Sequence, residues 1–141
     1  MNDNQIMLVG NITADPELRF TPGGQAVASL SIAHSTRRRN ADTNEWEDGK
    51  TSFFDVTLWG KLGENATASL KKGNRVVVLG RLEQQTWTVD VDGDEQKRSK
   101  VVVIADEVAP SLRWATAVVE KNAKGEGSTP APFGDAPVED F

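Results

Sequence analysis

Two large aromatic side chains, Phe53 and Trp59, lie on the polar face of a predicted strand. They share this face with Asp55 and Thr57, which mark it as solvated, whereas the alternate positions are uniformly apolar. Exposed aromatic rings can stack on nucleobases, and each stacked base contributes about 1–3 kcal/mol to binding. The other explanation is that a second chain or a loop covers both rings, and the strand by itself leaves the two explanations open.

Trp87 is a third candidate of the same kind. Polar residues flank it, and it precedes Asp92-Gly93, a pair typical of the tight turn of a β-hairpin. An exposed hairpin arm can hold a ligand against a small β-barrel. Val89 and Val91 lie on the same side of the strand as Trp87, so packing is the alternative role for this ring.

The two remaining tryptophans are assigned structural roles. Trp46 lies among acidic residues whose carboxylates would repel a phosphate, and we expect it to anchor a loop. Trp114 ends the β-rich part of the chain, and we expect it to pack the last segment down.

Basic residues that could contact phosphate are spread along the chain. Three consecutive arginines follow the second predicted strand at its exit into a loop, where they would repel one another unless an anion bound to them. Phosphate is the natural partner of such a run. We predict phosphate contacts at Arg37, Arg38, Arg39, Arg75 and Arg81.

The elements that must position these residues are mostly short strands. Hydrophobic alternation predicts five strands, with a turn at 21–24 before the second one. The predicted strands cover about residues 5–13, 25–36, 51–60, 75–91 and 98–108, and a polar loop occupies residues 37–50.

One short helix is predicted between the third and fourth strands. Apolar residues recur at helical spacing from Leu62 to Leu70. Lys71 and Lys72 would occupy its last turn, and Gly73 would cap its carboxyl end. Three strands, a helix and two strands follow the order of a five-stranded OB-fold barrel, so the predicted fold class is all-β.

The composition argues against an enzyme. The chain has no cysteine and one histidine, His34, so ligands for zinc are almost lacking. A lone histidine within a strand is more often structural than catalytic. No glycine-rich phosphate loop occurs, and the carboxylates cluster at predicted turns, where solvation explains them. We expect no catalysis, no metal and no other cofactor.

Charge and termini suggest the setting of the protein. The net charge is −5, and residues 115–141 hold two basic and five acidic residues, so the rest of the chain is closer to neutral. We predict a folded domain at 1–114 and a flexible, disordered acidic tail at 115–141. No apolar run reaches the length of a membrane span, and residues 1–5 lack the features of a signal peptide, so we expect a cytoplasmic protein.

Several separated motifs resemble bacterial single-stranded-DNA-binding proteins (SSBs). They occur in unbroken order between about residues 5 and 114, and include IMLVGN at 6–11, DPELRF at 15–20 and LWGKL at 58–62. The stretch APSLRWATA at 109–117 is similar to the actinobacterial or actinophage branch. The resemblance implies sequence-independent binding of single-stranded DNA in replication, repair and recombination, in the bacterial nucleoid or in the host cytoplasm of a phage.

The resemblance also implies roles for individual residues. Phe53, Trp59 and Trp87 match positions whose aromatic rings stack on bases, and Lys61 and Lys72 match positions along the DNA path. A further stacking position falls near an arginine at 38, whose guanidinium can itself stack on a base.

Assembly and partners are implied in the same way. The family typically forms homotetramers, and its acidic C-terminal tip recruits replication and repair proteins. Asp135, Glu139, Asp140 and Phe141 match this tip, although the proline that usually precedes the final Phe is absent. The alternative is an OB-fold adaptor or RNA binder with weak DNA binding, which the acidic net charge favours.

Overall fold

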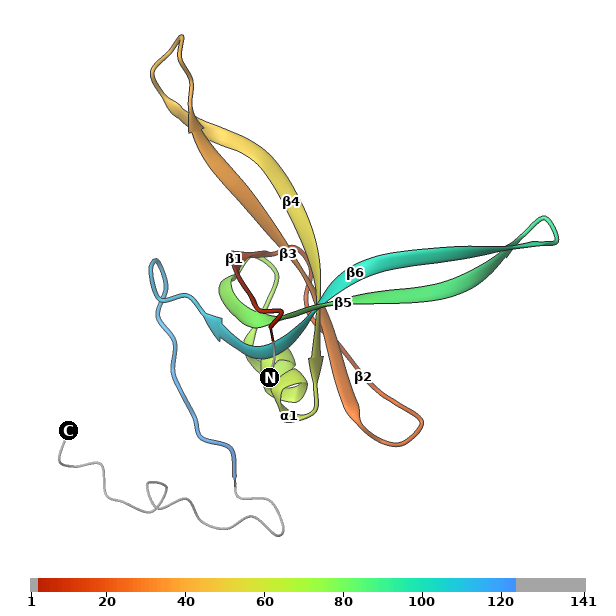
Figure 1. Cartoon of the computed structure of the whole chain (residues 1–141). Helices are drawn as coiled ribbons and strands as arrows, with labels where there is room; N and C mark the ends of the chain where they lie inside the picture. The colour runs from red at the N-terminus through yellow and green to blue at the C-terminus, as the bar shows by residue number, and fades with distance from the viewer. Residues whose placement is uncertain (1–2, 124–141) are drawn as a thin grey trace.

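The computed structural model describes residues 3–123, which form six strands and one helix (Figure 1). Five of the strands close a barrel in the order β1-β5-β6-β4-β3, because β1 pairs with both β5 and β3. All pairings are antiparallel except that of β4 with β6, where Val56 lies opposite Val103. The elements are β1 Ile6–Ile12, β2 Glu17–Phe20, β3 Ala26–Arg39, β4 Trp46–Trp59, α1 Lys61–Ser69, β5 Arg75–Val91 and β6 Asp94–Pro110.

This architecture confirms the predicted five-stranded OB-fold barrel with one helix before its fourth strand. The sixth strand, β2, was not predicted. It forms a short hairpin with β3 through the turn at 21–24, and Leu18 lies opposite Ala28. Its four residues alternate between charged and apolar types, but a strand this short gives only a weak periodic signal.

The barrel interior holds apolar side chains from every barrel strand and from the helix. On β4, Val56 and Leu58 are fully buried and Phe54 is half-buried against them, as the alternation predicted. Burial of such a side chain stabilises a fold by about 1.5–3 kcal/mol, so this face of β4 is fixed inward and the other faces solvent. The rest of the core consists of Leu8, Ile12, Ala28, Leu30, Ile32, Ala66, Leu70, Val76, Val78, Val103 and Ala105.

Two long hairpin arms extend from the barrel (Figure 1). The β3–β4 arm comprises residues 34–52, and the β5–β6 arm comprises residues 84–101. Asp92 and Gly93 both have positive φ angles, 53° and 85°, which confirms the predicted two-residue turn. Val91 therefore lies opposite Asp94, and β6 begins four residues earlier than expected.

The prediction of a loop at 37–50 was wrong. Arg37, Arg38 and Arg39 do not lie at a strand exit but continue β3, and they pair with residues 48, 47 and 46 of β4. Only the connection at 40–45 leaves the ladder. Apart from Trp46, the arm is polar on both faces, so hydrophobic periodicity could not reveal it, and cross-strand ion pairs support it instead.

The end of the helix also differs from the expectation. Helix α1 ends at Ser69, and Leu70 is extended and buried in the core, so Lys71 and Lys72 lie beyond the last turn. Gly73, with φ 91°, closes the turn that follows rather than capping the helix, and its N–H donates to the carbonyl of Ile12 at 2.7 Å. Burial of Leu70 therefore decides where the helix stops.

Candidate nucleic-acid interface

The outer face of β3 and β4 presents exposed aromatic rings. Phe53 is 68% and Trp59 42% exposed, and the side chains opposite them on β3 are the smaller Ala33 and Val27. No segment within residues 3–123 covers the Phe53 ring. Cover by a loop of the described residues, one form of the second explanation left open, therefore does not apply to it.

A groove of about 460 Å³ runs across this face beside Trp59. Thr57 and Trp59 of β4 contribute to its floor, and Glu17 and Arg19 of β2 line it from one side. Lys100 of β6 also lines it, from the base of the β5–β6 arm. The short strand β2, absent from the predicted set, thus forms part of the groove.

Trp87 lies on the groove side of the β5–β6 arm. Gln85, which lines the groove, lies opposite Lys100, and Trp87 lies two residues further out, opposite Arg98. Side chains two residues apart on a strand share a face, so Trp87 and Arg98 extend the groove lining along the arm. The Trp87 ring is 43% exposed.

The groove contains both signs of charge. Its lining includes two basic side chains, Arg19 and Lys100, and three acidic ones, Asp15, Glu17 and Asp55. The Lys100 ammonium lies 3.6 Å from the Asp55 carboxylate, and both side chains are exposed. An exposed pair of this kind is worth about 0–1 kcal/mol, so a stronger anion can compete for the lysine.

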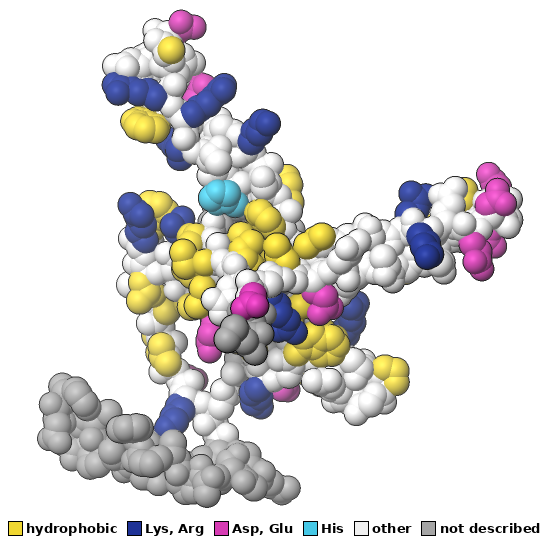
Figure 2. Space-filling model, viewed as in Figure 1, with side chains coloured by type: hydrophobic (Ala, Val, Ile, Leu, Met, Phe, Trp, Pro, Cys, Tyr) yellow, Lys and Arg dark blue, Asp and Glu magenta, His cyan; other side chains and the backbone are white. Residues whose placement is uncertain are grey.

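The arginines of the β3–β4 arm are paired across the ladder. The distance from the Arg37 guanidinium to the Asp48 carboxylate is 3.2 Å, and that from Arg38 to Glu47 is 3.1 Å. No salt bridge within the described residues engages Arg39. Figure 2 shows basic side chains along this arm, whereas acidic side chains gather at the tip of the β5–β6 arm.

The other predicted phosphate contacts lie outside the groove lining. Lys61 pairs with Glu64 at 3.9 Å and Arg81 with Asp106 at 3.6 Å, both at exposed positions. The backbone N–H of Lys72 donates to the Asp15 carboxylate at 2.8 Å, so the loop that carries it lies next to a residue of the groove lining. The contacts predicted for these three residues remain predictions.

Arg75 and Trp114 lie together at a second cavity, of about 720 Å³. The Arg75 guanidinium lies 4.9 Å from the centre of the Trp114 ring and donates to the Ser111 hydroxyl at 3.3 Å. Trp114 is 74% exposed, so it contacts the barrel through this arginine rather than by burial. Further along, the side chains of Asn65 and Asn122 donate to each other at 2.9 and 3.0 Å.

Sequence reasoning missed two basic residues of the interface, Arg98 and Lys100. The signal was present, because the turn at Asp92-Gly93 fixes which residues of the arm face each other. Counting back from that turn places Trp87 opposite Arg98. Trp46, expected to anchor a loop, instead lies on β4 with its ring 64% exposed.

Other candidate chemistry finds little support in the described part of the chain. A ring nitrogen of His34, Nδ1, lies 3.1 Å from the carbonyl oxygen of Val9, a structural contact between neighbouring strands. Within residues 3–123, no group of three potential metal ligands occurs and no helix is long and apolar enough to cross a membrane. The predicted tip, Asp135, Glu139, Asp140 and Phe141, lies outside the described residues.

Known proteins are similar in sequence to this chain over most of its length. The family described as the single-strand binding protein family matches residues 3–111. The single-stranded DNA-binding protein of Mycobacterium tuberculosis is 45% identical over 134 residues, which cover 92% of this chain and 80% of that protein. Its counterpart in Corynebacterium glutamicum is 48% identical over 128 residues, which cover 91% of this chain and 56% of that protein.

Solved structures share the fold. The crystal structure of a small single-stranded DNA-binding protein from Streptomyces coelicolor aligns with a TM-score of 0.63 at 33% identity, over 79% of this chain and 97% of that one. The Plasmodium falciparum SSB in complex with single-stranded DNA aligns with a TM-score of 0.64 at 26% identity, over 79% of this chain and 99% of that one.

Proposed function

We propose that this chain, which belongs to the single-strand binding protein family, binds single-stranded DNA without reading its sequence. Bases stack on Phe53, Trp59 and Trp87, because every base has a π-face whatever its identity. Membership of a family defined by binding agrees with the expectation that the chain is not an enzyme.

Phosphates are contacted by the basic side chains that share a face with these rings. Lys100 and Arg98 lie beside the groove and beside Trp87, and Arg37 and Arg39 belong to the β3–β4 arm. Their carboxylate partners, where present, are exposed and easily displaced by a polyanion. Roles for Arg38, Lys61, Lys72, Arg75 and Arg81 are part of the proposal, although the groove does not include these residues.

The observation that carries the proposal is the position of the three rings. Phe53 and Trp59 lie on the solvent face of a strand whose other face is fixed in the core, and Trp87 extends the same surface onto the β5–β6 arm. Exposing three large rings costs hydrophobic free energy in the absence of a ligand. A stacking ligand explains that arrangement.

Alanine substitution tests the stacking roles directly. We expect Phe53→Ala, Trp59→Ala and Trp87→Ala each to weaken binding of oligo-dT by about 5- to 150-fold, the equivalent of about 1–3 kcal/mol per base. The measurement is the dissociation constant at fixed salt.

Phe20→Ala is the matched control for these variants. This ring is also exposed, but its neighbours in the chain, Arg19 and Thr21, line the groove and Phe20 does not, so Phe20 points away from it. Its removal should leave the affinity unchanged. Full affinity in the three ring variants would favour the alternative function of a protein adaptor.

We further propose that the chain assembles as a homotetramer. Met7 and Leu79 lie directly opposite each other on β1 and β5, and both are exposed on the outside of the barrel. A second copy could cover this apolar pair. The mass of one chain is 15.3 kDa, and sedimentation equilibrium should give four times this value. A monomer at micromolar concentration would refute the tetramer.

The C-terminal tip is the proposed site for partner proteins. Asp135, Glu139 and Asp140 carry negative charge beside Phe141, a combination suited to a basic pocket with an apolar base. Removal of Phe141 should abolish capture of replication and repair proteins while oligo-dT binding persists. Unchanged capture would exclude this role.

A further inference from the structure

Trp46 is an exposed ring at the far end of the β3–β4 arm. It lies directly opposite Arg39 in the ladder, and 64% of it is exposed. Sequence reasoning gave it the role of a loop anchor, which the arm does not require, because residues 40–45 close the turn with their own contacts. The Asn40 N–H donates to the Glu45 carbonyl at 2.8 Å and the Asn44 N–H to the Asn40 carbonyl at 2.8 Å.

A β-bulge decides which face of the arm carries this ring. Ser35 lies opposite Thr51, but the next pair is Arg37 with Asp48, so β4 has one more residue than β3 between these pairs. In regular alternation Trp46 would share the inward face of Phe54 and the core residues. The extra residue reverses the parity of β4, so Trp46 lies on the face of Phe53 and Thr51.

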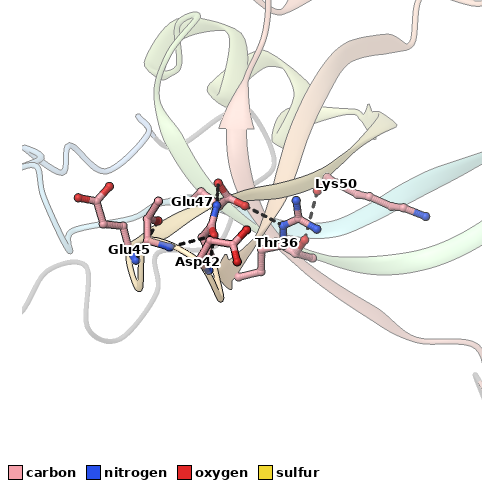
Figure 3. Close-up of polar contacts among 8 residues, drawn as sticks. Thr36, Asp42, Glu45, Glu47 and Lys50 are labelled. Carbon is pink, nitrogen blue, oxygen red and sulfur yellow. Dashed lines mark hydrogen bonds and ion pairs between the residues drawn. The ribbon is translucent and has the colours of Figure 1, made fainter.

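Contacts on the opposite face of the arm confirm this assignment. Arg38 pairs with Glu47, and the Asn40 side-chain amide donates to the same Glu47 carboxylate at 3.3 Å. Figure 3 shows this network around Glu47. These residues alternate with Arg37, Arg39 and Trp46, which must therefore project from the other side.

The bulge also separates charge between the two faces. The face of Trp46 holds two arginines, Arg37 and Arg39, against one carboxylate, Asp48. The opposite face holds Arg38 against Glu47, and they neutralise each other. The adjacent carboxylates that argued against a phosphate near Trp46 are thus partly directed away from it.

We propose that Trp46 is a fourth stacking position for single-stranded DNA, with Arg39 beside it contacting a phosphate. The inference rests on the proposed function and extends its surface from Phe53 to the end of the β3–β4 arm. The seven β3 residues from Ala33 to Arg39 are separated by six steps of about 3.3 Å, so they span roughly 20 Å. At a stacked spacing of about 3.4 Å, about six nucleotides cover that distance.

The test is the affinity of Trp46→Ala for oligo-dT of increasing length. One OB fold occupies about 4–16 nucleotides, so oligonucleotides at the short end of this range fill the groove and longer ones reach the arm. We expect Trp46→Ala to bind short oligonucleotides as the parent does and to lose about fivefold or more for long ones. Trp46→Phe should restore the affinity for long oligonucleotides, because it restores an aromatic face.

Arg39→Ala and Arg38→Ala form a matched pair that tests the face. Each variant removes one positive charge, and the two positions are adjacent in the sequence, but only Arg39 shares the face of Trp46. We expect Arg39→Ala to weaken binding of long oligonucleotides by a larger factor than Arg38→Ala, because the Arg38 guanidinium already pairs with Glu47. Equal effects of the two variants would overturn the assignment of faces.

A variant in which Trp46 is the sole tryptophan gives an independent readout. Replacing Trp59, Trp87 and Trp114 with Phe keeps aromatic faces elsewhere, and long oligo-dT should quench the remaining fluorescence. Absence of quenching in this variant would refute the role of Trp46. So would Trp46→Ala binding oligonucleotides of every length with the affinity of the parent. If Trp59→Ala still weakens binding, the proposed function stays intact. A loss of oligomer mass in Trp46→Ala would also overturn it, in favour of a contact between copies.

Discussion

At the scale of single residues, the least expected feature is a carboxylate in the groove. Asp55 lies on β4 between Phe53 and Trp59 in the alternating series, and its carboxylate is 3.6 Å from the Lys100 ammonium. A polyanion that approaches the stacking rings therefore meets a negative charge, and the nearest lysine is partly neutralised. Asp55 should weaken DNA binding rather than support it.

Asp55→Asn tests this cost. Asparagine keeps the shape of the side chain and removes the charge, which releases Lys100 for a phosphate. Two unit charges about 4 Å apart interact by about 1 kcal/mol in water, so oligo-dT should bind about fivefold more tightly at low salt. The gain should shrink as salt screens the charge, and titrations at several salt concentrations measure both effects.

Asp106→Asn is the control for net charge. Asp106 also pairs with a cation, Arg81 at 3.6 Å, but it does not line the groove. The substitution makes the same change in total charge but releases Arg81, which lies outside the groove lining, so its gain in affinity should be smaller than that of Asp55→Asn. Equal gains in the two variants would show that net charge, and not the position of Asp55, controls binding.

Some residues of the candidate interface could be predicted from the sequence and others could not, for physical reasons. Phe53 and Trp59 were evident because they interrupt a clear alternation with a buried face. Arg98 and Lys100 were not among the predicted contacts, because their positions beside Trp87 and the groove depend on the cross-strand register and not on their own neighbours in the sequence. Trp46 was assigned to a loop, and the face on which it lies could not be predicted, because one extra residue at the bulge reverses its side.

At the scale of elements, the β3–β4 and β5–β6 ladders each have one irregularity. On the β5–β6 side, Leu79 lies opposite Glu107 but Gly80 lies opposite Ala105, so β6 carries the extra residue. Bulges bend the strand and increase its twist. This one lies within the barrel, at Gly80, which also pairs with Ile6 of β1.

Gly80→Ala should destabilise the protein. A Cβ at this position would overlap the carbonyl of Ile104, and the Ala105 Cα would lie 3.0 Å away. Both contacts are backbone, which cannot move aside as a flexible side chain would. Overpacking of this kind typically costs about 1–3 kcal/mol, measurable as a lower free energy of unfolding in urea.

Gly23→Ala provides the comparison. Its Cβ would meet only the Thr21 hydroxyl, at 3.9 Å, so the free energy of unfolding should change by no more than about 0.5 kcal/mol. Equal stability of the two variants would show that the strands at Gly80 can separate without cost.

The core strands could be predicted from sequence, whereas the arms could not be predicted in full. Barrel strands bury one face and so leave an alternating apolar pattern, as at Val56 and Leu58. The β3–β4 arm has no buried face, so its composition resembles that of a loop. The formation of its two strands depends on how they pair with each other, and the local sequence does not encode that register.

At the scale of the whole molecule, the negative net charge is unevenly placed. Residues 124–141 hold one basic and four acidic residues, and basic side chains line the β3–β4 arm. An acidic segment joined to the barrel can compete with DNA for the basic face when no DNA is bound. The net charge of −5 therefore does not exclude a nucleic-acid binder.

Deletion of residues 124–141 tests this competition. The deletion retains Asn122 and its pair with Asn65, so the segment that contacts the helix is kept. We expect tighter binding of oligo-dT at low salt and no difference at high salt, where the charges are screened. Equal affinities of the two forms at low salt would exclude the competition.

The most direct test of the account is tryptophan fluorescence of the intact protein during titration with oligo-dT at several salt concentrations. Rings that stack on bases should be quenched deeply and to saturation. The logarithm of the binding constant should fall linearly with the logarithm of salt, by about 0.7 for each phosphate neutralised. An absence of quenching and of binding at low salt would mean that the exposed rings have another partner, and would contradict the proposed function.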